Sequence, residues 1–121
     1  MIGYVNIGTN DLPRAAKFYD TLLGLIGAKR FMETERHIAW SNGGPGLVVC
    51  KPFDGKAATV GNGSMVALAA GSKENVSALY KKALELGGKD EGAPGPRGTG
   101  GFYGAYFRDL DGNKLCAFHL G

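Results

Sequence analysis

The stretch GFYGAYFRDLDGNKLCAFH, residues 101–119, decides the fold of this chain. Apolar residues alternate from Phe102 onward, the polar run DLDGN follows at residues 109–113, and a second alternating run closes the stretch. Asp, Gly and Asn favour a turn because Gly and Asn tolerate positive φ and Asp side chains accept backbone N–H bonds. The stretch therefore predicts a β-hairpin in which Tyr106 lies opposite Cys116.

The two faces of this hairpin differ in chemistry, since side chains alternate between faces along a strand. One face is purely apolar and suits packing beneath helices: Ala105, Phe107, Leu115 and Ala117. The other combines rings, a phenol, a thiol and a position without a side chain: Phe102, Gly104, Tyr106, Cys116 and Phe118. Two interpretations of this second face stay open: the wall of a small-molecule cavity, with Gly104 as a gap, or an ordinary half-buried sheet.

Composition restricts the class of protein. A chain of 121 residues, 44% of them hydrophobic, can bury the core of one domain. The 21 glycines are spread over turns and loops, which indicates a turn-rich β structure rather than a fibre. The net charge is +3 and the basic residues are scattered. We therefore expect no nucleic-acid partner.

Targeting and redox features indicate a cytoplasmic protein. No apolar run approaches the roughly 20 residues of a membrane span, and the N-terminus MIGYVNIG lacks the pattern of a secretory signal. The two cysteines, Cys50 and Cys116, have no framework spacing, which fits a reducing compartment. We expect no membrane partner and two free thiols.

The order of predicted elements repeats along the chain. Strands are expected at residues 3–8, 28–33, 37–41 and 47–51, then at 64–70, around 89–91 and in the two arms of the hairpin. One helix follows an Asp11 N-cap and ends at Gly24 with positive φ, and a second runs from a Ser72 cap to Gly87. Residues 92–101, rich in Gly and Pro, are expected to form a loop.

This order predicts an α+β fold of two βαβββ modules. We expect a single domain over residues 1–121, with module one at 1–52, a linker at 53–63 and module two at 64–121. The helices would cover the outer face of an open, curved mixed sheet. The opposite face would then be concave and free to form a cleft.

Several runs resemble the vicinal oxygen chelate superfamily of glyoxalases, bleomycin-resistance proteins and extradiol dioxygenases. They are VNIGTNDL at residues 5–12, Phe18-Tyr19, LGL at 23–25 and DLDGNKL at 109–115. The resemblance covers nearly the whole chain. It implies paired βαβββ modules in a homodimer whose clefts draw on both chains, and it leaves the chemistry open because the superfamily hosts many reactions.

Metal-dependent members of that superfamily hold a divalent cation with two His and one Glu. The resemblance places these positions at Tyr4, Met65 and Cys116. A phenol and a thioether are poor ligands for the nickel, manganese, zinc or ferrous ions that favour imidazole and carboxylate. We therefore expect no metal site and no cofactor.

Candidate site residues follow from strand parity and from the resemblance. The ligand-binding candidates are Tyr4, Asn6, Trp40, Met65, Arg97, Phe102, Tyr106, Cys116 and Phe118. Trp40 is interpreted either as core or as a flat stacking wall, and Arg97 either as a clamp for an anionic group or as a free loop residue. His37 and Cys116 are the candidates for a general base and a nucleophile, each weighed against a structural role.

Three functions stay open. The first is a metal-free binder of a planar or amphipathic small molecule. The second is an enzyme, a glyoxalase-type lyase or thiol transferase, that is metal-free or uses unrecognised ligands such as His37 with Glu33 or Glu35. The third is a dimerisation or interaction module whose cleft is filled by its own side chains.

Overall fold

A computed structural model describes all residues from 1 to 121. Module one contains β1 (Tyr4–Gly8), α1 (Leu12–Gly24), β2 (Lys29–Glu33), β3 (His37–Ser41) and β4 (Gly46–Cys50). Module two contains β5 (Val66–Ala69), α2 (Lys73–Glu85), β6 (Lys89–Arg97), β7 (Phe102–Arg108) and β8 (Lys114–Leu120). The predicted α+β fold of two βαβββ modules is confirmed.

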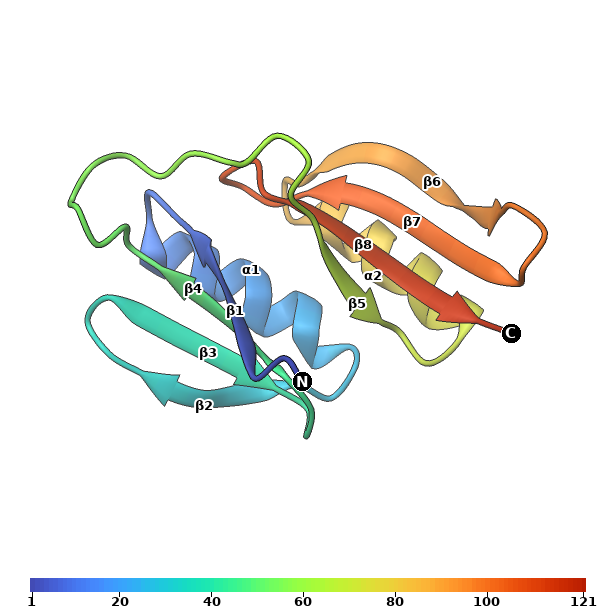
Figure 1. The fold of residues 1–121 in the computed structure, drawn as a ribbon, viewed down its shortest axis with the longest axis horizontal. Helices are drawn as coiled ribbons and strands as arrows, with labels where there is room; N and C mark the ends of the chain where they lie inside the picture. The colour runs from blue at the N-terminus through green and yellow to red at the C-terminus, as the bar shows by residue number, and fades with distance from the viewer.

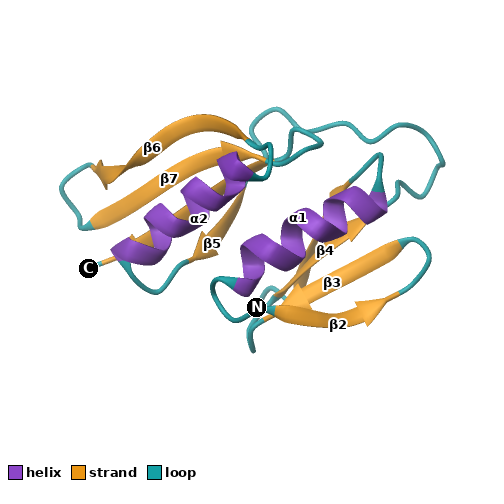
Figure 2. Ribbon diagram, turned by 180° about the vertical axis from the view of Figure 1, so that it is seen from behind, coloured by secondary structure: helices purple, strands orange, loops and turns teal.

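The strands form one layer and the helices a second layer behind it (Figures 1 and 2). Sheet A, of module one, has the strand order β1-β4-β3-β2, and sheet B, of module two, has the equivalent order β5-β8-β7-β6. In each sheet the first strand pairs in parallel with the last strand of its module, and all other pairs are antiparallel. The faces turned away from the helices, here called the open faces, are covered by no other element (Figure 1).

The β7–β8 hairpin has the predicted register. Tyr106 pairs with Cys116 and Phe107 with Leu115. Phe107 and Leu115 are fully buried beneath α2, whereas Phe102 and Phe118 are only partly buried. The assignment of the two faces is therefore confirmed.

The helix starts follow the predicted caps. The Asp11 carboxylate accepts the backbone N–H of Arg14 at 3.0 Å, and the Ser72 hydroxyl accepts that of Asn75 at 3.0 Å. The first helix ends at Gly24, as predicted. The positive φ expected at Gly24 is wrong, because it occurs three residues later, at Gly27, with a φ of 76°.

The segment predicted as a loop after residue 91 is largely a strand. β6 continues to Arg97, with register irregularities between Asp90 and Gly92 and between Gly92 and Gly95. Prolines are tolerated in this strand because it lies at the edge of sheet B, where a strand pairs on one side only. The low strand propensity of Gly and Pro suggested a loop here, but pairing with β7 holds the segment in a strand.

The core lies between the sheets and the helices and runs through both modules. Its largest fully buried side chains include Tyr19 and Phe18 of α1, Leu79 of α2, and Trp40 of β3. The Tyr19 and Trp40 rings lie 5.7 Å apart. Both helices, at 13 residues each, are too short and too polar to cross a lipid bilayer.

The modules are locked together by the turn Asp109–Asn113, here called the Asp turn. One Asp111 carboxylate oxygen accepts the Thr9 hydroxyl at 2.6 Å. The other accepts the Asn10 backbone N–H at 2.9 Å and lies 3.4 Å from the Arg14 guanidinium. The turn of the module-two hairpin thus provides hydrogen-bond acceptors for the polar groups of module one at the start of α1.

Asp109 extends this lock into the core. Its Oδ1 accepts the backbone N–H groups of Asp111 and Asn113, each at 2.9 Å. Its Oδ2 accepts the Tyr19 hydroxyl at 2.6 Å and the Asn113 side-chain amide at 2.9 Å. Asn113 also donates to the Gly8 carbonyl at 2.9 Å. A buried carboxylate needs such partners, and here each oxygen has two.

This network makes the protein sensitive to alkali at Tyr19. Burial, followed by the neighbouring Asp109 charge, holds the pKa of Tyr19 well above its ordinary value of about 10. Above that pH the unfolded chain releases the Tyr19 proton while the folded chain retains it, so the free energy of unfolding falls as pH rises. We expect Tyr19→Phe to be less stable than the native protein by about 2 kcal/mol below pH 10, and this difference to shrink between pH 10 and 11. Melting temperatures of both proteins across pH 8–11 test this, and a constant difference would contradict it.

Candidate functional site

The open face of sheet A carries an uncovered apolar hollow. Its cavity of about 370 Å³ is lined by Tyr4, Asn6, Phe31, Met32, Thr34, His37, Ala39 and Val48. Tyr4 and Phe31, on the two edge strands β1 and β2, are each 62% exposed and leave apolar surface open to solvent. The candidates Tyr4, Asn6 and His37 are thus brought together, as strand parity suggested.

Sequence reasoning missed two walls of this hollow, Phe31 and Met32. Neighbouring strand residues normally point to opposite faces, yet both of these line the same cavity. The pairing of β2 with β3 shifts register between Arg30 and Met32, and an irregularity of this kind redirects a side chain. Alternation in the sequence carries no signal for such a shift.

His37 places an imidazole in the hollow. Its Nδ1 lies 3.4 Å from the Thr34 hydroxyl oxygen, and its backbone N–H donates to the same oxygen at 3.0 Å. Its register partner on β4 is Cys50. Burial raises the pKa of the Cys50 thiol, although nearby Arg36 opposes the shift. The thiol is therefore protonated at neutral pH and is a weak nucleophile.

The open face of sheet B carries an aromatic pair. The Phe102 and Phe118 rings are stacked, with centroids 5.5 Å apart and planes 3° from parallel. The interpretation of Gly104 as a gap is wrong, because the Phe102 ring lies over it: a Cβ at Gly104 would meet Phe102 Cε1 at 2.6 Å. The missing side chain makes room for the ring rather than for a ligand.

Tyr106, beside this pair, lies under two cations. The Arg97 guanidinium carbon is 5.4 Å and the Lys114 ammonium nitrogen 5.6 Å from the Tyr106 ring centroid. Arg97 does not hang free in a loop: it donates to the carbonyls of Ala93 at 2.7 Å and Gly95 at 2.9 Å on its own strand. Lys114 forms no salt bridge and was missed at the sequence level, although its parity with Cys116 places it on this face.

Cys116 forms the floor of this face and is 1% exposed. Burial raises the pKa of its thiol, and this outweighs the lowering effects of the Tyr106 hydroxyl and of the Arg97 and Lys114 charges. The residue is therefore a protonated thiol at neutral pH. At 1% exposure it offers a ligand almost no contact area, and as a protonated thiol it is not a ready nucleophile.

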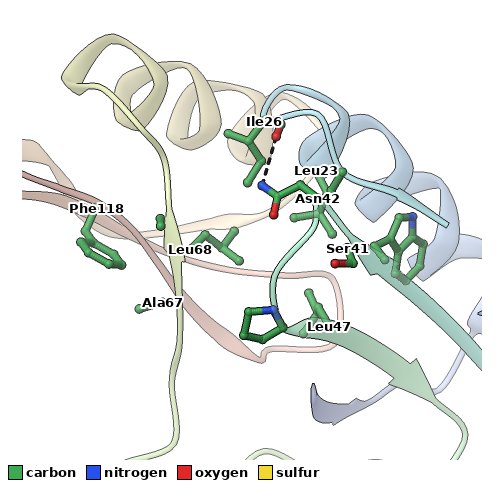
Figure 3. Close-up of a pocket in the computed structure, with 12 residues that line it drawn as sticks. Leu23, Ile26, Ser41, Asn42, Leu47, Ala67, Leu68 and Phe118 are labelled. Carbon is green, nitrogen blue, oxygen red and sulfur yellow. Dashed lines mark hydrogen bonds between the residues drawn. The ribbon is translucent and has the colours of Figure 1, made fainter. Parts of the chain in front are cut away.

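Trp40 lies on the helix side of sheet A, not on the open face. Its ring is 1% exposed and its indole N–H donates to the Asp20 carboxylate at 2.9 Å. Of its two sequence interpretations the structure favours the core. One edge of Trp40 contributes to a crevice of about 290 Å³ between the modules. Figure 3 shows the walls of this crevice, with Ala67, Leu68 and Phe118 from module two and Leu23, Ser41, Asn42 and Leu47 from module one.

The three positions that the resemblance assigns to metal ligands do not form a suitable donor set. Tyr4 lines the hollow of sheet A, Cys116 lies on the open face of sheet B, and Met65 lines cavities beside β5 that include neither of them. Glu33, proposed as a partner of His37, instead bonds Arg30 at 3.0 Å. No three His, Cys, Asp or Glu side chains lie close enough together to hold a metal ion.

Comparison with known proteins agrees with this architecture. The profile of the Glyoxalase/Bleomycin resistance protein/Dioxygenase superfamily matches residues 1–117. A glyoxalase/bleomycin resistance protein from Albidiferax ferrireducens T118 is 38% identical, with 98% of each chain covered and a TM-score of 0.91. A search of the curated proteins gave no match.

More distant structures share the fold. A hypothetical protein from S. aureus is 25% identical, with 98% of this chain and 91% of that chain covered and a TM-score of 0.75. Lactoylglutathione lyase from Agrobacterium tumefaciens is 19% identical, with 98% and 92% covered and a TM-score of 0.74. At this identity the likeness to the lyase shows the fold alone.

Proposed function

Because the chain belongs to the glyoxalase/bleomycin resistance protein/dioxygenase superfamily, we propose that it binds a small planar molecule with an anionic group. The observation that carries this proposal is the open face of sheet B. There the Tyr106 ring lies beneath two cations and beside the stacked Phe102–Phe118 pair. Flat rings offer stacking area, and Lys114, which has no carboxylate partner, offers a charge to an anion.

Binding is proposed to be independent of a metal ion. Phenol, thioether and protonated thiol replace the imidazoles and carboxylate that such ions prefer, and no cavity is lined by more than one of the three side chains. The proposed function is therefore sequestration of the ligand rather than metal-dependent isomerisation.

The active form is proposed to be a cytoplasmic homodimer. Tyr4, Phe31 and Met32 leave an apolar surface exposed on sheet A, and the partly buried Phe102–Phe118 pair lies on the open face of sheet B. Placing sheet A of one copy over sheet B of another would enclose a cleft between two such faces. Enclosure removes ligand surface from water, which a single open face achieves only in part.

A fluorescent anionic dye, 8-anilinonaphthalene-1-sulfonate, tests the binding site. We expect saturable binding to the folded protein and a dissociation constant about fivefold higher for Lys114→Gln, because one cation beside the Tyr106 ring is lost. The matched control is Lys89→Gln, which removes an exposed lysine from β6 and is expected to leave the dissociation constant unchanged. Equal affinities of the two variants would contradict the proposed site.

Sedimentation equilibrium, combined with the same dye titration, tests whether binding requires the dimer. We expect the native protein to sediment as a dimer. Tyr4→Glu, which places a charge on the apolar surface of sheet A, should yield a monomer with weaker dye binding. A native monomer with full dye affinity would remove the dimer from the proposal and leave the sheet B site in place.

A metal-free enzyme is the second candidate, and His37 is the observation that favours it. This imidazole lines a hollow of about 370 Å³ together with Asn6 and Tyr4, so a bound carbonyl compound would meet a base and two hydrogen-bonding groups. A lyase reaction fits this set better than thiol transfer, because both cysteines have raised pKa values. Turnover of an α-hydroxycarbonyl substrate that is lost in His37→Gln would support this candidate.

A further inference from the structure

A basic hollow lies at the edge of sheet A where the C-terminal ends of the parallel strands β1 and β4 meet. Its cavity of about 500 Å³ is lined by Thr9, Asn10, Arg36, Lys51, Pro52, Phe53, Gly55, Lys56 and Ala57. The walls come from the β1–α1 junction, the β2–β3 turn and the segment after β4 (the long green loop in Figure 1). It shares no lining residue with the hollow on the open face of sheet A.

The charge of this hollow is unbalanced. Arg36, Lys51 and Lys56 all line it, and none forms a salt bridge with a carboxylate. The acid of the same segment, Asp54, accepts the backbone N–H of Lys56 at 3.0 Å. Three cations around one cavity raise the local concentration of anions, and they suit a group of high charge density such as a phosphate.

The hollow also presents a bare aromatic ring. Phe53 is 93% exposed, and its ring lies beneath the Arg36 guanidinium at 5.3 Å from the carbon to the ring centroid. Because Phe53 does not pack into the core, its side chain contributes little to the stability of the fold. Its face is available for stacking by a second ring, with the guanidinium beside it.

The walls are held in place by hydrogen bonds. The Asn10 side chain accepts the backbone N–H of Ala58 at 2.7 Å and donates to the Ala58 carbonyl at 3.3 Å. On the opposite side Arg36 donates to the Lys51 carbonyl at 3.1 Å, and the Lys51 N–H donates to the Arg36 carbonyl at 2.9 Å. The segment that carries Phe53 and Lys56 is thus held to the β1–α1 junction at one end and to the β2–β3 turn at the other.

We propose that this hollow binds an aromatic phosphate, with the phosphoryl group among Arg36, Lys51 and Lys56 and the ring against Phe53. The volume of about 500 Å³ accommodates a single aryl or nucleoside phosphate. The site is independent of the proposed ligand cleft, because it uses none of the residues of the open faces.

Calorimetric titration with phenyl phosphate and with inorganic phosphate tests the proposal. We expect phenyl phosphate to bind more tightly than inorganic phosphate, and both to bind more weakly as NaCl is raised. The variant Arg36→Gln/Lys51→Gln/Lys56→Gln should lose at least about tenfold in affinity for both. Its matched control, Lys17→Gln/Lys29→Gln/Lys89→Gln, removes three exposed lysines outside the hollow, carries the same net charge and should bind like the native protein.

Phe53→Leu tests the ring separately, and at 93% exposure its effect on folding is negligible. We expect it to weaken phenyl phosphate about fivefold or more and to leave inorganic phosphate unchanged. Lys114→Gln distinguishes the two sites: it should weaken any phenyl phosphate bound at Tyr106 on sheet B and leave binding in the basic hollow unchanged. No heat of binding for phenyl phosphate, or equal losses in the two triple variants, would overturn the proposal. An unchanged phenyl phosphate affinity in Phe53→Leu would remove the ring from the site.

Discussion

Asp109→Ala is expected to lower the free energy of unfolding by about 4 kcal/mol. The carboxylate is 5% exposed and accepts four hydrogen bonds, two from backbone N–H groups and two from the side chains of Tyr19 and Asn113. Its removal leaves the Tyr19 hydroxyl and the Asn113 amide buried with an unmet donor each, and an unmet buried donor costs about 1–3 kcal/mol. Urea unfolding followed by far-ultraviolet circular dichroism measures the loss, and the melting temperature should fall by about 10 °C or more.

Two further variants control this result. Asp54→Ala makes the same chemical change at an exposed turn, where the carboxylate accepts one backbone N–H, and is expected to cost less than about 1 kcal/mol. Asp109→Asn retains one acceptor and the side-chain volume, so we expect an intermediate loss. If Asp109→Ala and Asp54→Ala unfold at the same urea concentration, the Asp turn does not act as the lock between the modules.

Gly88→Ala is expected to destabilise the protein by about 3 kcal/mol through backbone crowding. Gly88 follows α2, and its N–H donates to the Ala83 carbonyl at 2.8 Å. A Cβ at this position would lie 2.6 Å from the Arg108 carbonyl oxygen and 2.7 Å from that of Ala83. Neither atom belongs to a flexible side chain, so α2 would have to move away from β7. Chemical denaturation of the purified variant measures the loss.

Gly24→Ala is the matched control for this substitution. Gly24 is the last residue of α1, and a Cβ there would meet nothing within 4 Å. Alanine has the higher helix propensity, so this variant should equal or exceed the native stability by up to about 1 kcal/mol. A stable Gly88→Ala protein would show that the end of α2 relaxes without cost.

The sequence predicted what depends on local pattern. Alternation between Phe102 and Phe118 sets the hairpin register and separates its two faces, and this held because one face must be buried. The caps at Asp11 and Ser72 were predictable for a similar reason, since each satisfies backbone donors within its own first turn.

Features that depend on contacts between distant segments were not predictable. The Asp turn was recognised as a turn, but its bonds to Thr9 and Tyr19 join residues about ninety to one hundred positions apart. The same limit applies to Trp40: alternation shows that it lies opposite His37 and Ala39, yet only the packing of α1 decides which face is buried. The basic hollow is formed by three segments that are separate in the sequence, so no single stretch of sequence predicted it.

The long span of the Asp turn has a consequence during synthesis on the ribosome. Thr9, Arg14 and Tyr19 emerge from the ribosome about ninety to one hundred residues before their partners at Asp109 and Asp111. During vectorial folding the polar groups at the start of α1 therefore stay without these partners until the Asp turn has been synthesised. A nascent polypeptide stalled before the β7–β8 hairpin would expose this region to chaperones and proteases, and emergence of the hairpin would cover it.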